Sequence, residues 1–312
     1  MKRFKTLLCT ALMVTTCFGL FGCGTTDSGT DTNTVVDSGA DTEVTADTEK
    51  NDVFSVVSSF YPMHIMAMNL IAGIDGVTET SMSEPDIGCI HDHTFTTDDL
   101  KKVEGADVYI ENGLGLEAFN DKIKEAYPNT VIIEAATNIT DADINPHVWT
   151  NIDYYISQVQ YASEQLQTVN PDNKDAYAAN ADAYVAELEK LKTDNEAVII
   201  AATGKKALVL DEALPNLCEF LKMDVIEIET DHEEEALSAD DLKETINTMN
   251  SEGIKTIFIG KDADRATAEA IATETGATIY ELNTCMVGTA DSSADSYITE
   301  MKENFEIIST IE

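Results

Sequence analysis

Histidine is rare in this chain, so the position of each histidine is informative. The 312 residues include only five, and imidazole is both an acid–base group and the commonest side-chain ligand of transition metals. His91 and His93 share one polar segment, and His147 lies in Asn145-Pro146-His147-Val148-Trp149, beside the only tryptophan. Taken alone, each of the three is more often a surface or packing residue than a ligand, because sites assembled from distant loops leave no short spacing signature.

The other two histidines have simpler interpretations. His64 follows Pro62 at the start of an expected helix and is interpreted as a packing residue. His232 lies in the acidic run 231–235, which favours a solvated charged loop over a metal-binding one. The chain also lacks a nucleophile elbow, a His-Glu-x-x-His motif, a Walker loop and a Gly-rich dinucleotide fingerprint. The histidines by themselves therefore leave a metal site open and do not establish one.

The elements that must position these histidines alternate between short apolar strands and helices. This alternation is typical of parallel sheets covered by helices, whose ligands bind at the carboxyl ends of the strands. Strands are expected at 53–57, 106–110, 131–133, 207–210, 225–229, 256–259 and 278–282, and helices at 63–72, 98–103, 212–221, 239–250, 265–274 and 293–306.

A long helical region divides these elements into two groups. The pattern from 152 to 191 is helical throughout, with one break at Asn170-Pro171, because proline is poorly tolerated inside a helix. We therefore predict an α/β fold of two Rossmann-like lobes with parallel sheets. The predicted lobes are 53–170 and 204–312, joined by a long rigid linking helix at 171–203.

The N-terminus determines the predicted compartment. Residues 1–22 have three basic residues followed by an apolar stretch too short to span a membrane, as in a signal peptide. They end at Leu20-Phe21-Gly22-Cys23, which resembles a lipobox and implies lipidation of Cys23. Residues 23–52 are almost all small or acidic, which predicts a disordered tether. The mature protein is thus expected to be extracytoplasmic and lipid-anchored to the outer face of the cell membrane.

The charge excludes one class of partner. The whole chain has a net charge of −39, and removal of a signal peptide with three basic and no acidic residues leaves −42. Such a surface repels nucleic acid.

Several segments, in order, resemble the zinc- and manganese-binding solute-binding proteins of ABC transporters. The most specific is Asn145-Pro146-His147-Val148-Trp149, and the likeness covers about residues 53–310. That family has two α/β lobes linked by a rigid helix, with the metal in the cleft between them. The other matching segments are Ser59-Phe60-Tyr61-Pro62, His91-Asp92, Asn112-Gly113, Leu116-Glu117, 210–214 and 274–277.

The resemblance implies a set of ligands. His91 and His147 match the first two histidine ligands of the family, Asp211 matches the third position, with Glu212 beside it, and Asn283 matches the fourth, which is normally an aspartate. His93, Glu212 and His232 are possible substitutes. Two imidazoles with carboxylate and amide oxygens form a harder set than three imidazoles and a carboxylate, which shifts the preference toward Mn²⁺ or Fe²⁺.

The resemblance also bears on the cysteines that remain after the signal peptide and Cys23 are set aside. It places the segments of Cys89 and Cys285 near the metal cleft, whereas Cys218 has no such assignment. A Cys89–Cys285 bridge, a thiolate ligand and buried free thiols all stay open, and buried free thiols are the commonest case.

The resemblance implies a binding protein rather than an enzyme. We expect a monomer that captures zinc or manganese and delivers the ion to the membrane subunits of an ABC permease. Two alternatives remain. The changes in the second lobe are compatible with a degenerate family member that acts as a surface receptor or adhesin. A metal-dependent enzyme, which would need an open coordination position, is less favoured.

Overall fold

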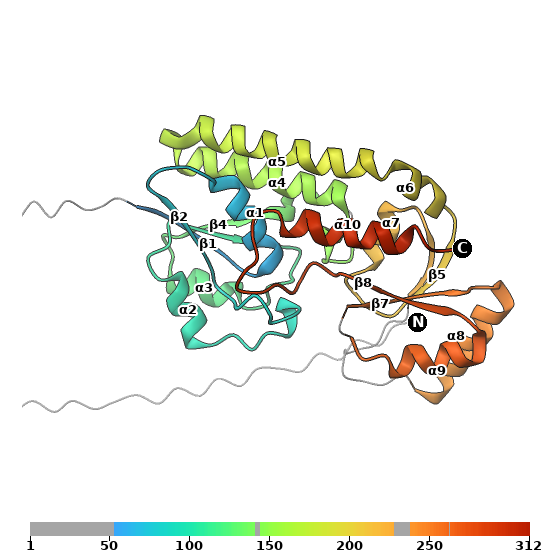
Figure 1. Cartoon of the computed structure of the whole chain (residues 1–312). Helices are drawn as coiled ribbons and strands as arrows, with labels where there is room; N and C mark the ends of the chain where they lie inside the picture. The colour runs from blue at the N-terminus through green and yellow to red at the C-terminus, as the bar shows by residue number, and fades with distance from the viewer. Residues whose placement is uncertain (1–52, 141–143, 228–237, 262) are drawn as a thin grey trace, which may run out of the picture. The chain divides into compact units, whose positions relative to one another are not determined.

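The computed structural model describes residues 53–140, 144–227, 238–261 and 263–312 (Figure 1). The predicted signal peptide, Cys23, the predicted tether and His232 lie outside the described residues. Within the described part of the chain, no helix combines the length and the apolar character that crossing a bilayer requires.

The first lobe is a four-stranded parallel sheet with the order β2-β1-β3-β4. Its strands β1 and β3 are short, apolar and buried, as expected for the centre of a parallel sheet. The elements are β1 (Phe54–Ser58), α1 (Tyr61–Ile71), β2 (Val77–Ser81), α2 (Thr97–Val103), β3 (Val108–Glu111), α3 (Asn120–Ala126) and β4 (Val131–Glu134).

Helices α4 (Ile152–Val169) and α5 (Lys174–Asp194) lie side by side and lead from the first lobe to the second (Figure 1). Asn151 caps α4, since its side chain accepts hydrogen bonds from the backbone N–H groups of the first turn. After Asn195 the chain continues as α6 (Glu196–Ala202). The long helix expected from the sequence is therefore present as α5, followed by a short second segment.

The second lobe repeats the topology of the first, with a parallel sheet in the order β6-β5-β7-β8. Helices α8 and α9 both end at a left-handed glycine, at Gly253 and Gly276. The elements are β5 (Lys206–Val209), α7 (Pro215–Phe220), β6 (Asp224–Glu227), α8 (Ala239–Glu252), β7 (Thr256–Gly260), α9 (Ala266–Thr275), β8 (Thr278–Leu282) and α10 (Ser296–Ile308).

The predicted fold class is confirmed, and the differences are local. The sequence prediction omitted β2 because its sequence, VTETS, is polar, as suits an edge strand with alternating exposure. It also omitted α3, a short polar helix with a single buried side chain, Ile123. Neither element carries an apolar period long enough to be recognised from the sequence.

One hydrophobic cluster runs through both lobes. It includes side chains from α1, α4, α5 and α10, and α10 packs against α1, α5 and α6 (Figure 1). Tyr155 of α4 stacks on Tyr297 of α10, with ring centroids 4.1 Å apart. The Tyr61 hydroxyl donates a hydrogen bond to the Glu300 carboxylate at 2.8 Å. Shared packing of this kind resists the separation of the lobes.

Candidate metal site

Three loops bring potential ligands into one place. His91 lies on a 3₁₀ turn, Ile90–Asp92, in the connection between β2 and α2. His147 immediately precedes a second 3₁₀ turn, Val148–Thr150, which leads into α4. Glu212 follows β5 at the carboxyl end of the second sheet, where ligands of parallel α/β sheets usually bind. The two imidazoles therefore come from the first lobe and the carboxylate from the second.

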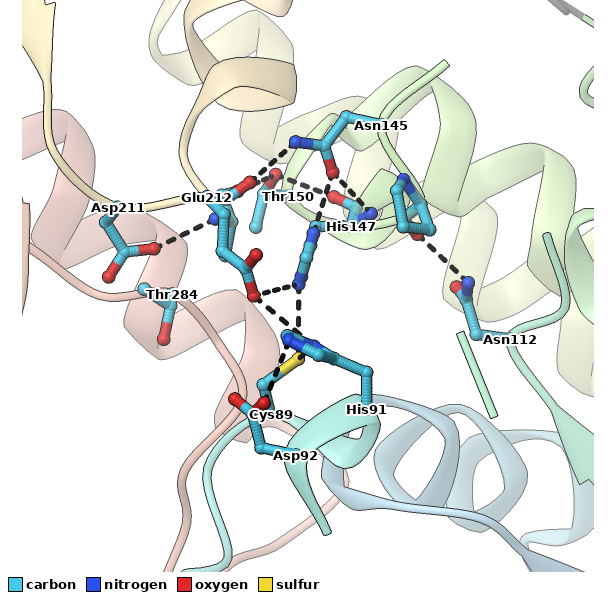
Figure 2. Close-up of polar contacts among 12 residues, drawn as sticks. Cys89, His91, Asp92, Asn112, Asn145, His147, Thr150, Asp211, Glu212 and Thr284 are labelled. Carbon is cyan, nitrogen blue, oxygen red and sulfur yellow. Dashed lines mark hydrogen bonds and ion pairs between the residues drawn. The ribbon is translucent and has the colours of Figure 1, made fainter. Parts of the chain in front are cut away.

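The ligand atoms of Cys89, His91, His147 and Glu212 all lie within 4.8 Å of one another, and we call these residues the four-donor cluster (Figure 2). The Cys89 Sγ lies 2.7 Å from His91 Nδ1 and 3.2 Å from His147 Nε2. Glu212 Oε1 lies 3.3 Å from His91 Nδ1 and 3.1 Å from His147 Nε2. A tetrahedral zinc ion holds its ligand atoms roughly 3.3–3.7 Å apart, so such an ion needs the donors to move by less than about 1 Å.

The outer nitrogen of each imidazole is already engaged. His147 Nδ1 lies 2.7 Å from Asn145 Oδ1, and His91 Nε2 lies 3.1 Å from Asp92 Oδ1. In the neutral tautomer with the proton on the outer nitrogen, each outer nitrogen donates to its acceptor partner, and each inner nitrogen presents its lone pair to the cluster. A carboxylate behind a histidine is the arrangement that commonly orients metal-binding imidazoles.

Lone pairs therefore exceed protons inside the cluster. With both imidazoles neutral, two ring nitrogens and the Glu212 carboxylate are acceptors, and the Cys89 thiol supplies one proton. One proton cannot serve all of these groups at once. A divalent cation, or protonation of the imidazoles, satisfies them together, and the residues present therefore fit a metal ion.

Asn145 links the two halves of the site. Its Oδ1 also accepts the His147 backbone N–H at 2.9 Å, and its Nδ2 donates to the Glu212 backbone carbonyl at 2.8 Å (Figure 2). Its own carbonyl accepts from Asn216 Nδ2 at 3.0 Å. The Thr150 hydroxyl adds a further bond between the lobes, to the Ala213 carbonyl at 2.8 Å. The asparagine two residues before His147 thus fixes both the imidazole and the loop that carries the carboxylate.

Hydrogen bonds and ring contacts also fix the rest of the Asn145–Trp149 segment. The Asn112 side chain donates to the Pro146 carbonyl at 3.0 Å, which explains the Asn112-Gly113 motif. The Trp149 ring is fully buried, and its Nε1 donates to the Thr284 carbonyl of the second lobe at 3.0 Å. The Trp149 ring also contacts the His147 ring edge-on, with centroids 5.2 Å apart.

The pKa values of Glu212 and the neighbouring Asp211 shift in opposite directions. Burial by itself would raise the pKa of the Glu212 carboxyl, but in the metal-free state with both rings protonated, the hydrogen bond from His147 and the positive charges of His147 and His91 lower that pKa below the usual value. Burial raises the pKa of Asp211. The carboxylate that faces the imidazoles is thus the one more readily ionised.

The structure brings together only some of the residues predicted from the sequence. His91, His147 and the substitute Glu212 converge, whereas the Asp211 side chain turns away, and its Oδ1 accepts the Ala213 N–H at 2.9 Å (Figure 2). Its other oxygen packs so closely on Gly260 that a Cβ there would lie 2.1 Å from it.

Two further predicted residues are engaged elsewhere. Asn283 Oδ1 accepts the Cys285 N–H at 3.0 Å, and His93 Nε2 pairs with Asp99 Oδ2 at 3.0 Å. Cys285 is a free, buried thiol, so the bridge to Cys89 is not formed.

Sequence reasoning gave too little weight to three participants. A Cys89 thiolate was one of several open alternatives, and its place two residues before His91 was the available signal. The roles of Asp92 and Asn145 are those of outer partners of the imidazoles, and each lies within two residues of the histidine that it orients.

The model of the family described as "ZnuA: Zinc-uptake complex component A periplasmic" matches residues 56–311. The chain belongs to this family. The family match includes every residue of the four-donor cluster.

Relatives of this zinc-uptake family differ in the metal that their names state. The chain is 22% identical to the manganese-binding lipoprotein MntA of Halalkalibacterium halodurans, over 91% of each chain. It is 27% identical to the iron ABC transporter substrate-binding lipoprotein MtsA of Streptococcus pyogenes, over 70% of this chain and 77% of the relative. Among solved structures, FpvC of Pseudomonas aeruginosa in complex with Ni²⁺ matches with a TM-score of 0.73 at 25% identity, covering 82% of this chain and 95% of that one.

Proposed function

We propose that this protein is the extracytoplasmic substrate-binding lipoprotein of a metal-ion ABC transporter. It holds a divalent transition metal between its lobes and presents the ion to the permease subunits. The ion is cargo, and no bond of it or of any other substrate is broken. The family membership and the lipoprotein names of the relatives support this proposal.

One observation carries the proposal. His91 and His147 of the first lobe and Glu212 of the second present three ligand atoms to one another across the lobes, with the outer nitrogens of both imidazoles engaged. Imidazole and carboxylate ligands suit zinc and the neighbouring transition metals. In this proposal Glu212 is the ligand from the second lobe, in place of Asp211 and Asn283.

Anchoring to the membrane is a separate part of the proposal. The lipobox-like segment ending at Cys23 would hold the mature protein at the outer face of the membrane, and the acidic segment 24–52 would let the folded part reach the permease. Expression of the whole chain with and without a Cys23→Ala change, followed by membrane fractionation, tests this anchor. Release of the Cys23→Ala protein from the membrane is expected, and unchanged association would contradict it.

Calorimetric titration of the metal-free mature chain with Zn²⁺ and Mn²⁺ tests the function. We expect one ion per chain, and we expect His147→Ala to abolish high-affinity binding because His147 is the most deeply buried imidazole of the site. His64→Ala is the matched control, since His64 pairs with Glu79 away from the cluster. Failure of the wild-type protein to bind either ion would reject metal transport and leave the receptor alternative.

A further inference from the structure

The Cys89 sulfur occupies the fourth corner of the proposed metal site. It lies closer to His91 Nδ1, at 2.7 Å, than the Glu212 carboxylate does, at 3.3 Å. It also faces His147 Nε2 at 3.2 Å, so both inner ring nitrogens converge on the sulfur as well as on the carboxylate (Figure 2). Cys89 is only 6% exposed, so its sulfur is largely shielded from water.

The neighbouring oxygen donors are committed elsewhere. The Asp211 carboxylate accepts a backbone N–H and packs against Gly260, and the Asn283 amide oxygen accepts another backbone N–H. Either residue would have to give up its contact to reach the cluster. The sulfur needs no such rearrangement.

We infer that Cys89 is a metal ligand that directs this site toward zinc-like, thiophilic ions and away from manganese. The inference rests on the proposed function of the same site. A thiolate, two imidazoles and one carboxylate form a four-coordinate set of the kind that zinc accepts, with a bond of about 2.3 Å to sulfur. Mn²⁺ prefers oxygen donors and gains little from a thiolate. One thiolate and one carboxylate also balance the charge of a dication.

This assignment reverses the metal preference expected from the sequence. Asp211 and Asn283 would have made the donor set harder and favoured Mn²⁺ or Fe²⁺, whereas the sulfur of Cys89 makes it softer. The spacing of the four donors does not by itself select a metal. The chemistry of the sulfur does, and Cys89 is therefore the residue to change.

The experiment titrates the reduced, metal-free mature chain with Co²⁺, Zn²⁺ and Mn²⁺. A Co²⁺ complex with a thiolate ligand shows a sulfur-to-metal charge-transfer band in the near ultraviolet. We expect this band in the wild-type protein and in the control Cys218→Ser, whose thiol lies in α7, and we expect its loss in Cys89→Ser. We also expect Cys89→Ser to weaken Zn²⁺ binding by about 100-fold, the upper end of the loss of affinity caused by removing a residue that hydrogen-bonds a metal ligand. The same change should alter Mn²⁺ binding far less.

The possible outcomes separate the two proposals. Cobalt binding without the band, or Cys89→Ser with wild-type zinc affinity, would overturn the role of Cys89 and leave the proposed function intact. No binding of any of the three ions by the wild-type protein would reject the proposed function itself. If Cys89→Ser does not fold, zinc-edge X-ray absorption of the wild-type complex decides, because the inference requires a sulfur neighbour at about 2.3 Å.

Discussion

Replacing Asn145 with alanine should weaken both metal binding and folding, because one side chain serves both. The change removes the hydrogen bonds of Asn145 with His147 Nδ1, with the His147 N–H and with the Glu212 carbonyl. Each bond contributes about 1 kcal/mol net, so the free energy of unfolding should fall by about 3 kcal/mol. For a chain of this size that corresponds to a decrease of roughly 6–12 °C in Tm. Loss of the partner behind His147 should weaken zinc binding by about 10- to 100-fold.

Two variants separate the two effects. Asn145→Asp keeps an oxygen for His147 and loses the amide that donates to Glu212, so it should destabilise the protein while retaining more of the metal affinity than alanine does. Asn129→Ala, at an exposed position, is the control for the loss of an asparagine. Thermal unfolding followed by circular dichroism and calorimetric titration with Zn²⁺ measure both quantities. Wild-type zinc affinity in Asn145→Ala would refute the argument that this residue orients the imidazole.

Three further predictions concern stability. Zinc at 100 times its Kd should raise the free energy of unfolding by about 2.7 kcal/mol, measured as a rise in Tm that a chelator reverses. A Tm that zinc does not change would contradict the proposed metal site. Trp149→Phe should cost about 1–3 kcal/mol in denaturant unfolding, because the buried Thr284 carbonyl loses its donor; an unchanged midpoint would show that the bond is dispensable. Burial, reinforced by the charge of Glu117, raises the pKa of Glu111 in the folded protein. Because the folded state then binds this proton more tightly than the unfolded state does, the free energy of unfolding of the metal-free protein should fall as the pH rises from the ordinary glutamate pKa to the raised pKa. Glu111→Gln should flatten this loss, and an unaltered slope between about pH 5 and pH 8 would place its origin elsewhere.

The architecture could be predicted from the sequence because it depends on patterns that repeat. Apolar strands such as Val108–Glu111 and the long helical run after Pro171 are identified by a pattern that extends over several residues. The polar edge strand β2 could not be recognised, because its stability comes from pairing with β1 rather than from its own composition.

Only part of the four-donor cluster could be predicted from the sequence, because the conformation of a single turn decides which side chain faces it. Asp211 and Glu212 are adjacent acids, and which one faces the imidazoles depends on the turn after β5, where Asp211 accepts the Ala213 N–H. That bond turns Asp211 aside and leaves Glu212 for the cluster. No periodicity in the sequence encodes such a choice. The convergence of His91 and His147 could be expected because the segments around them resemble those of a known family.

The four donors differ in how far they are shielded from water, and in the proposed site this difference would order the steps of loading and release. His91 and Glu212 have side chains 33% and 37% exposed, whereas His147 is 3% exposed and Cys89 is 6% exposed. In the proposed metal site, an arriving hydrated ion would therefore meet the outer pair, His91 and Glu212, first and would exchange its last waters for the inner pair, His147 and Cys89. Departure would run in reverse, so a partner that displaced His91 or Glu212 would open the way out without separating the lobes. The outer pair would then set the rate of release, and the inner pair the tightness of retention.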